Sequence, residues 1–559
     1  MPRTPTLALG LVAAALLAAC GGADTASGTE SGSRKLLATT SVASTFGVTA
    51  ANGLLTVDSG AGLVFVVKQA GGDITSIRYN GGPELQLAND YSQLSSGLGA
   101  TVSYAVSGGV AKITLSTPTA TQYLLVRQGE NNIYMGTYIT AEPTVGELRW
   151  VTRFNPAYFN SFPVESNLGG AVSQVGEEDD VYVLADGTTR SKFYGNQRAM
   201  DLSIRGITGP GIGVFMAYGN RESSSGGPFY RDIQNQSNVP EHGYAAAVHV
   251  YNYLNSAHTQ SEPFRTGFFG PYALVFNNGT ATPAIPGMSW MESQNLSGWV
   301  PASQRGKVVG QGLYGFNLTN KFTVGFANAT AQYWAAAKAP NGSFSVPAMK
   351  AGTYTMTVYK EELALYTETV TVQSGATTTL PLRTLGNDPQ KDPAVWRIGT
   401  WDGTPLEFRN GDGIPTRHPS DVRNLPWGPT TYVVGDPARS FPALQWVRDI
   451  NNPTTVRFTL TPEQITSHTL RVGVTLSVKG ARPQVKVNAW NSSNPSGPAS
   501  IASRLTLGTY RGNNATYTFT VPASAFVAGT NTLTINAISG STGNGFLSPA
   551  LAYDAIDLL

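Results

Sequence analysis

The sequence predicts an all-β protein built from several sandwich-like domains, and three observations support this. Charged residues make up only 13% of the chain, against a usual ~25%, while Gly 62, Pro 34 and 10% aromatic residues suit tight turns and pleated sheets. Short alternating apolar runs, separated by Gly and Asn, recur along the chain. A length of 559 residues is too great for one core and suggests about three or four domains.

The N-terminal segment has the pattern of an export signal. A basic start precedes an apolar run over Leu7–Ala19, which is shorter than the ~20 residues that span a bilayer. The run ends in LAAC at Cys20, and a Gly- and Ser-rich stretch follows, which resembles the lipobox and tether of bacterial lipoproteins. We therefore expect a signal peptide over 1–19, lipid attachment at Cys20 and a flexible tether over 20–44. The alternative is an ordinary cleavage site with an incidental cysteine.

The first large domain is expected over 45–300 as an antiparallel β-sandwich. Its strands are indicated by period-2 runs with short turns between them, namely LLTV, LVFVVK, ITSIRY, VSYAV, KITLS, YLLVRQ and IYMGTYI. From Gly146 to Asn278 the chain is richer in charged and aromatic residues and has longer polar loops. Because polar loops on a sheet scaffold usually carry binding and catalytic residues, we place the site there.

Two smaller β domains follow. The runs GKVVGQG, FSVPAMKAGTYTMTVYK and ETVTVQSGATTTLPL predict a fibronectin-III-like sandwich over 301–386, with Pro347 and Gly352 marking turns between strands. A jelly roll is expected over 394–559. It holds five of the nine tryptophans, Trp396, Trp401, Trp427, Trp446 and Trp490. These rings could stack on sugars, but core filling is the better account of most of them.

Composition excludes several classes of protein. A net charge of +2 without blocks of like charge argues against a nucleic-acid surface. One cysteine permits no internal disulfide, and without Cys/His pairs a structural zinc site has no ligands. The GxSxG elbow, the HExxH zinc motif, the P-loop and the EF-hand loop are all absent from the sequence.

One candidate cluster lies in the segment HVYNYLNSAHTQSEPFRTGFFGPYALVFNN, residues 249–278. Tyr251 and Tyr253 have strand spacing, so both rings should project from one face of a sheet, and His258 follows five residues later. Histidine exchanges protons near neutral pH, and a phenol can donate to oxygen. The alternative is two packed tyrosines and a surface histidine.

A second candidate cluster is basic. The stretch RSKFYGNQR, residues 190–198, contains Lys192, and Arg149 and Arg153 precede it on the strand ELRWVTRF. Since charge is scarce in this chain, several cations among aromatic residues suggest a carboxylate-binding site. The alternative is a solvated basic strand edge.

These motifs together resemble the rhamnogalacturonan lyases of polysaccharide lyase family 4. The resemblance rests on NGLLTVDSGAGLVFVV, GELRWVTRF, RSKFYGNQ, AHTQSEPFRTGFFGPYALVF, RGKVVGQ and VWRIGTWDGTPLEF, which run in family order from about residue 45 to the C-terminus. It implies a large N-terminal β-sandwich of galactose-mutarotase type, a fibronectin-III-like domain and a carbohydrate-binding-module-like jelly roll. It also implies an enzyme that cuts the pectin backbone of alternating rhamnose and galacturonate.

Matched position by position, the resemblance assigns roles to five residues. The catalytic lysine falls on Lys192 and the catalytic histidine on His258, while Arg149, Tyr251 and Tyr253 contact the sugars. Which of Lys192 and His258 is the base and which the acid stays open.

The resulting hypothesis is a rhamnogalacturonan endolyase that cleaves the rhamnose–galacturonate bond of rhamnogalacturonan I by β-elimination. The alternative is a pectin-binding surface lipoprotein without catalysis. A glycoside hydrolase would need two carboxylates, for which EEDD at 177–180 is the candidate. We expect no required cofactor, although oxygen-rich loops such as NDPQKD and the Asp402–Asp412 region would suit calcium. We also expect a monomer that touches a membrane only through its lipid, as a cell-surface or outer-membrane lipoprotein, or else a secreted protein.

Overall fold

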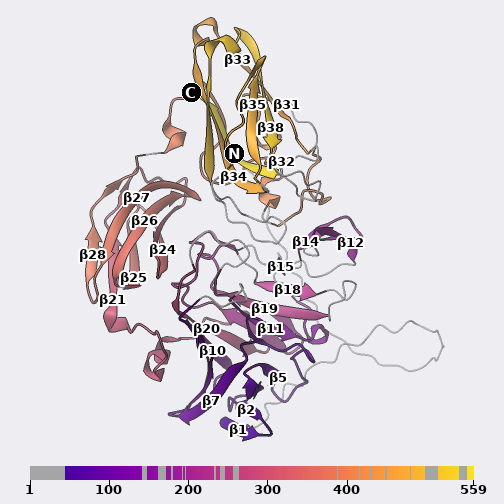
Figure 1. The fold of residues 1–559 in the computed structure, drawn as a ribbon, viewed down its shortest axis with the longest axis vertical. Coiled ribbons are helices and arrows are strands. Elements are labelled where there is room, and N and C mark those ends of the chain that lie inside the picture. The colour runs from indigo at the N-terminus through magenta and orange to yellow at the C-terminus, as the bar shows by residue number, and fades with distance from the viewer. Residues whose placement is uncertain are drawn as a thin grey trace, which may run out of the picture. The chain divides into compact units, whose positions relative to one another are not determined.

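The described part of the protein is built of strands, which confirms the predicted fold class. The computed structural model describes residues 44–141, 148–161, 172–177, 181–191, 193–194, 197–231, 234–238, 246–255, 264–386, 388–414, 416–427, 431–446, 450–478, 480–497, 514–539 and 550–559. The helices within these ranges are short 3₁₀ turns, named η. Strands make up most of the coloured ribbon in Figure 1. The period-2 runs of the sequence coincide with these strands, so local alternation locates most of the framework.

Four sheets are described before residue 280. One has the order β1 (Gly47–Ala51), β2 (Leu54–Asp58), β3 (Leu63–Lys68), β5 (Ile74–Tyr79). The longest has the order β16 (Ile204–Gly209), β17 (Ile212–Ala217), β20 (Gly267–Asn277), β10 (Asn132–Ile139), β9 (Ala120–Arg127), β8 (Val110–Ser116), β7 (Ala100–Ser107), β4 (Ala70–Gly71). A third has the order β15 (Phe193–Tyr194), β18 (Asn235–Asn238), β19 (Ala247–Tyr253), β11 (Arg149–Phe154), β6 (Gln93–Leu94). The fourth has the order β12 (Val172–Glu177), β13 (Val181–Leu184), β14 (Thr189–Ser191).

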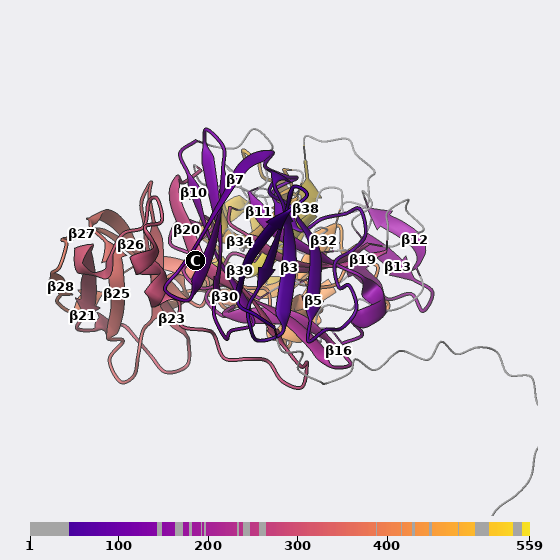
Figure 2. The ribbon, with the colours of Figure 1, turned by 90° about the horizontal axis from the view of Figure 1, so that it is seen from below.

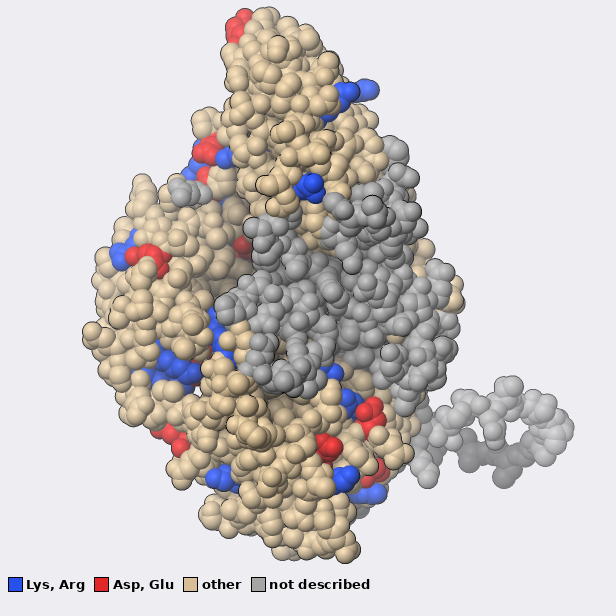
Figure 3. Space-filling model, in the orientation of Figure 1, with Lys and Arg blue, Asp and Glu red and all other residues tan. Residues whose placement is uncertain are grey.

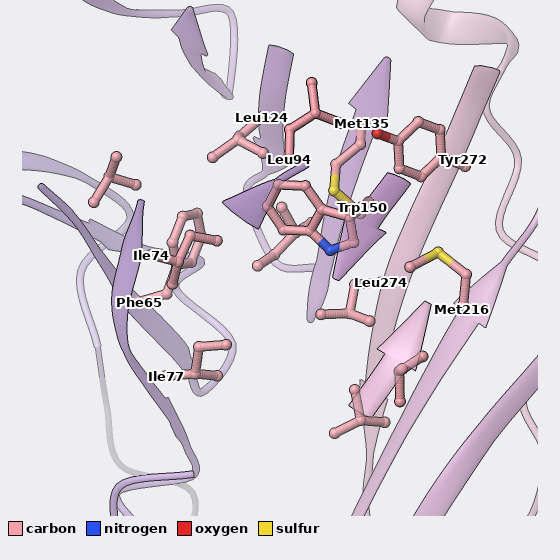
Figure 4. Close-up of a cluster of buried hydrophobic side chains, with 14 of the residues drawn as sticks. Phe65, Ile74, Ile77, Leu94, Leu124, Met135, Trp150, Met216, Tyr272 and Leu274 are labelled. Carbon is pink, nitrogen blue, oxygen red and sulfur yellow. The ribbon is translucent and has the colours of Figure 1, made fainter. Parts of the chain in front are cut away.

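The core of this first part lies between its sheets. Figure 2 shows β3 and β5 on one side and β7 and β10 on the other. Their inward side chains form one apolar cluster, in which Phe65 and Ile77 are directed toward Trp150 and Leu274 (Figure 4). Trp150 lies on β11 and is 1% exposed. Since side chains alternate along a strand, burying Trp150 turns Arg149 and Val151 to the opposite face of β11.

The middle part is a smaller sandwich with its own core. One side has the order β25 (Phe344–Lys350), β21 (Arg305–Gly310), β28 (Thr377–Leu380), and the other has the order β24 (Gln332–Ala336), β23 (Phe322–Ala327), β26 (Gly352–Lys360), β27 (Leu363–Val372). A short pair joins β22 (Leu313–Tyr314) to β29 (Arg383–Thr384). Apolar residues between Val308 and Leu385 form the cluster between these sheets. The turns η1 (Pro156–Tyr158), η5 (Ser289–Gln294) and η6 (Ala302–Gln304) precede it along the chain.

The turn expected at Pro347 is wrong. Pro347 lies inside β25, where the pairing with β21 shifts register and Ala348 has φ 55°. Two residues of β25 there oppose one residue of β21, which is a β-bulge, and a bulge accepts a proline because no ladder N–H is needed. The expected turn before Gly352 is present, since β26 begins there directly after β25 ends at Lys350.

The last part is a two-sheet jelly roll. One sheet has the order β30 (Trp396–Gly399), β39 (Ala550–Leu558), β34 (His468–Val478), β37 (Ala515–Val521), with β32 (Leu444–Trp446) also paired to β39. The other has the order β31 (Thr431–Val433), β33 (Thr454–Leu460), β38 (Gly529–Ile538), β35 (Arg482–Val487), β36 (Trp490–Asn491). The turns are η7 (Pro389–Lys391), η8 (Gly411–Gly413), η9 (Ala438–Ser440), η10 (Pro462–Gln464) and η12 (Ala523–Ala525).

The tryptophans of the jelly roll fill its interior, as predicted for most of them. Trp396, Trp401 and Trp446 are 7%, 1% and 5% exposed. Trp427 and Trp490 are half-buried and pack against the same core. Stacking on a sugar ring needs an accessible ring face, so the three buried tryptophans stabilise the fold rather than bind a ligand.

A buried glutamate joins the loop after β17 to the middle sandwich. Glu222 is 2% exposed and its carboxylate accepts two hydrogen bonds from Arg305, at 2.6 and 2.9 Å, and one from the Tyr333 hydroxyl at 2.6 Å. The Lys350 ammonium lies 3.2 Å away. Burial opposes ionisation, but these partners outweigh it and hold the pKa of Glu222 at about 2. The carboxylate is therefore ionised, and its hydrogen bonds and ion pair hold the loop after β17 against the middle sandwich.

A second junction ties the jelly roll to β14. Asp421 accepts hydrogen bonds from the backbone N–H and the hydroxyl of Thr189, both at 2.7 Å. Arg423 donates to Asp421 at 2.6 Å and to the Thr189 carbonyl at 3.0 Å. Thr189 is 1% exposed, and both its backbone groups are thus held by the loop at residues 421–423. Lys192 follows β14 directly in the sequence, one residue after Ser191.

Candidate active site

The candidate site is the face of the five-stranded sheet opposite Trp150. Strands β11 and β19 are antiparallel neighbours, and their register pairs Arg149 with Tyr253, Val151 with Tyr251 and Arg153 with His249. Alternating residues share a face, so three residues of each strand project together. The sheet therefore gathers two arginines, two tyrosines and a histidine that lie about one hundred residues apart in sequence.

The two tyrosines lie side by side, as their strand spacing predicts. Their ring centroids are 5.5 Å apart, and both rings pack on Val151. The Arg149 guanidinium carbon lies 5.9 Å from the Tyr251 ring centroid and 5.7 Å from that of Tyr253. Cation–π attraction acts over such distances and holds the guanidinium beside the phenols.

The Tyr251 hydroxyl stays protonated at ordinary pH. Burial raises the pKa of Tyr251 to about 12, although the charges of Arg149 and Arg153 oppose this. A neutral phenol has one O–H to donate and also accepts hydrogen bonds. Tyr251 is 4% exposed, whereas Tyr253 is half-buried. The face therefore offers a phenol donor and an arginine cation close together.

His249 is a residue of this face that the sequence motifs did not single out. It is 3% exposed, and its Nδ1 lies 3.2 Å from the Tyr251 hydroxyl oxygen. Burial lowers the pKa of His249 to about 3, and the charges of Arg153 and Arg149 add to the effect, so the imidazole is neutral. The signal that could have found it is the alternation His249, Tyr251, Tyr253, which places all three on one face.

The two arginines of β11 have different surroundings. The Nε of Arg153 lies 3.0 Å from a carboxylate oxygen of Asp90, and its guanidinium also donates to the Tyr91 carbonyl. Arg149 lies instead against the two tyrosine rings. Arg198, from the basic stretch at 190–198, pairs with Asp201 at 2.6 Å and lies 3.6 Å from Glu362. The predicted basic cluster is thus divided, with Arg149 and Arg153 on the site face and Arg198 engaged with acids elsewhere.

Several predicted residues lie outside the described part of the chain. These are Lys192, His258, Cys20 and residues 178–180, and the side chains of Arg190 and Glu177 are not described either. Their roles stay predictions. Lys192 lies between β14 and β15 in sequence, and His258 follows the end of β19 by five residues.

Within the described ranges, no three His, Cys, Asp or Glu side chains are placed to hold a metal ion. The expectation about calcium is not decided by this and stays a prediction.

Charged side chains are few and scattered on the coloured surface in Figure 3. In the same part of the chain, no helix has the length and apolar character needed to cross a membrane.

Comparisons with known proteins agree with a carbohydrate-active β-sandwich that carries two further β domains. Residues 46–298 match the N-terminal model of rhamnogalacturonan lyase B, residues 278–380 match domain II of polysaccharide lyase family 4, and residues 394–558 match its domain III. The chain therefore belongs to polysaccharide lyase family 4. This confirms the predicted family and its fibronectin-like and carbohydrate-binding-like domains.

Two relatives show how far the similarity extends. Rhamnogalacturonate lyase A of Aspergillus aculeatus is 41% identical over 522 residues, which cover 92% of this chain and 96% of that protein. Rhamnogalacturonate lyase A of Emericella nidulans is also 41% identical over 522 residues, with the same two coverages. The similarity thus runs through all three parts of the chain.

Proposed function

We propose that the protein is a rhamnogalacturonan endolyase that cleaves the rhamnose–galacturonate bond of rhamnogalacturonan I by β-elimination. The observation that carries the proposal is the arginine–tyrosine face of β11 and β19, in a chain similar over nearly its whole length to rhamnogalacturonate lyases. An anionic uronate needs a cation beside its carboxylate, and a sugar needs aromatic and hydroxyl groups to orient it. Arg149, Tyr251 and Tyr253 supply both.

The first step of the proposed reaction is neutralisation of the uronate carboxylate. Loss of the proton at C5 leaves negative charge that spreads into this carboxylate, so a cation beside it lowers the barrier. A guanidinium suits the task because it binds a carboxylate through two parallel hydrogen bonds and stays charged. We assign this role to Arg149, with Tyr251 and Tyr253 orienting the sugars on either side of the bond.

The second step is transfer of two protons by Lys192 and His258. One residue takes the C5 proton, the C4–oxygen bond breaks as the C4–C5 double bond forms, and the other protonates the departing oxygen. A lysine acts as the base only when neutral, which requires its pKa to lie well below ~10.4. We favour Lys192 as base and His258 as acid, and exchanged roles would leave the products unchanged.

The test is incubation of the purified protein with rhamnogalacturonan I. The product of β-elimination absorbs ultraviolet light through its new double bond, so absorbance should rise as the polymer shortens. Cleavage without this rise would indicate hydrolysis and would direct attention to the carboxylates at 177–180. No cleavage of any kind would contradict the proposal.

Substitutions separate catalysis from binding. Lys192→Ala and His258→Ala should each abolish product formation, while the polysaccharide should still retard each variant in a native gel. Lys307→Ala is the matched control, because Lys307 is an exposed lysine on β21 of the middle sandwich. If all variants and the wild-type protein bind the polymer without cleaving it, the protein is a pectin-binding module instead.

For location, we propose a bacterial lipoprotein anchored through Cys20. The support is the LAAC sequence after an apolar run, followed by a Gly-, Ser- and Thr-rich stretch. One acyl chain binds a membrane only weakly, so several chains on Cys20 are needed for stable attachment. Gly21 lacks the acidic character linked to inner-membrane retention, which favours the outer membrane or the cell surface. A secreted form without lipid is the alternative.

We further propose a monomer that needs no cofactor. In the proposed reaction Arg149 neutralises the carboxylate, and Lys192 and His258 transfer the two protons. These side chains supply every role in the reaction, so it requires no metal ion. Light scattering of the purified protein, compared with the mass of 59.0 kDa expected for one chain, tests the oligomeric state.

A further inference from the structure

His249 has a fixed place beside the proposed site. It lies on β19 two residues before Tyr251, and its cross-strand partners are Arg153 on β11 and Gln236 on β18. Its ring meets the Tyr251 ring edge to face, with centroids 5.6 Å apart and planes at 89°. This packing leaves the imidazole little freedom to turn away from the phenol.

The contact between the two side chains is a hydrogen bond. The Tyr251 oxygen lies 3.2 Å from Nδ1 of His249, and both residues are almost fully buried. A phenol O–H can rotate about its C–O bond, and a partner on one side fixes the direction of that rotation. The hydrogen bond that the Tyr251 oxygen makes to the proposed sugar then has a defined direction.

The imidazole makes this hydrogen bond in its neutral form. Arg149 and Arg153 are the cations near it, and Asp90 pairs with Arg153. Burial beside two cations keeps His249 neutral, so it does not serve as the proton donor of the reaction. A neutral ring nitrogen still gives or receives a hydrogen bond, depending on its tautomer.

We infer that His249 is a positioning residue for the lyase reaction, which orients the Tyr251 hydroxyl toward the sugar through its Nδ1. The inference rests on the proposed function, because it assigns Tyr251 to the bound substrate. His249 itself acts through Tyr251. Its removal should therefore impair turnover more than polymer binding and should have no effect when Tyr251 has no hydroxyl.

The experiment compares three substitutions of His249. His249→Asn places an amide near the position of Nδ1, His249→Gln places one near Nε2, and His249→Leu has neither. We expect kcat/KM to fall about tenfold in His249→Leu and His249→Gln, the loss of one hydrogen bond of about 1.4 kcal/mol, and to recover largely in His249→Asn. Equal losses in the Asn and Gln variants would overturn the inference.

A double-mutant cycle with Tyr251→Phe provides the decisive comparison. In the Tyr251→Phe background, His249→Leu should cause no further loss of kcat/KM, because the bond it removes is already gone. A loss of the same size in both backgrounds would show that His249 acts elsewhere, and the inference would be wrong. Melting temperatures of all variants identify any that fail to fold. If His249→Leu fails to fold, the comparison of His249→Asn with His249→Gln decides.

His468→Leu serves as the control for burial. His468 is 8% exposed in the jelly roll, and its two ring nitrogens lie 2.8 Å from the carbonyls of Leu559 and Gln464. Its loss should lower stability and leave kcat/KM unchanged. If wild-type protein forms no unsaturated product at all, the proposed function fails. If wild-type is active and the cycle shows no coupling, only the role of His249 fails.

Discussion

Three carboxyl groups lie close together inside the jelly roll and make its stability depend on pH. Asp554 is 1% exposed, and its Oδ1 accepts hydrogen bonds from the backbone N–H groups of Asp402 at 3.1 Å and Gly403 at 2.7 Å. Glu407 accepts one from the backbone of Thr400 at 2.7 Å. Burial raises the pKa of Asp402 to about 6, and repulsion from Glu361 adds to this. Burial also raises the pKa of Glu407 to about 7, with a further contribution from the charge of Asp402.

The direction of the effect follows from proton linkage. A carboxyl whose pKa is higher in the folded state than in the unfolded state stabilises the fold below its unfolded pKa, and this stability is lost as pH rises through the folded pKa. For Glu407 the interval runs from its ordinary pKa of 4.5 to about 7 and corresponds to about 3 kcal/mol. The free energy of unfolding of the jelly roll should therefore fall between pH 5 and pH 8.

The perturbation is Glu407→Gln, which keeps an oxygen for the Thr400 N–H but cannot ionise. At pH 8 in the presence of EDTA, it should raise the free energy of unfolding by up to about 3 kcal/mol, and at pH 4.5 it should change nothing. Hydrogen exchange at β30 and β39 during denaturant titration reports on this domain separately from the others. Glu463→Gln is the control, because Glu463 is exposed at η10 of the same domain. An equal gain at both pH values, or a loss at pH 8, would refute the argument.

Three further outcomes are expected. Asp421→Ala removes the acceptor of two Thr189 hydrogen bonds and should lower the free energy of unfolding by about 2 kcal/mol. It should also lower kcat, because β14 leads into Lys192. Asp436→Ala, in an exposed turn of the same domain, is the control and should have neither effect. Treatment with EDTA should leave lyase activity unchanged, and a loss restored by calcium would contradict this. Cys20→Ser should release the enzyme from the membrane fraction or block its processing, whereas wild-type protein found wholly in the medium and cleaved beyond Cys20 would exclude the anchor.

Much of the framework can be predicted from sequence because its signals are local. Alternation within a strand is set by the two faces of the sheet, so runs such as LVFVVK at β3 mark the strand and its buried residues. The same period of two is enough to place Tyr251 and Tyr253 on one face. The burial of the jelly-roll tryptophans follows from the cost of leaving large rings exposed.

The rest depends on pairing between strands distant in sequence. The register of β11 against β19, which brings Arg149 beside Tyr253, cannot be derived from either strand alone. Nor can the pairing of Arg153 with Asp90 or the junction of Thr189 with Asp421. The turn predicted at Pro347 is wrong because proline usually ends a strand, and only the opposing strand reveals the bulge that admits it.

His249 and Tyr251 keep their protonation states across the physiological pH range, and this limits where the pH dependence of the proposed reaction can arise. With a pKa of about 3 for His249 and about 12 for Tyr251, neither side chain changes its protonation state between pH 5 and pH 9. The proposed anionic substrate would thus meet these two rings in the same neutral state throughout this range. Any limb in the pH profile of kcat must then come from groups other than His249 and Tyr251, and the proposed base and acid, Lys192 and His258, are the candidates.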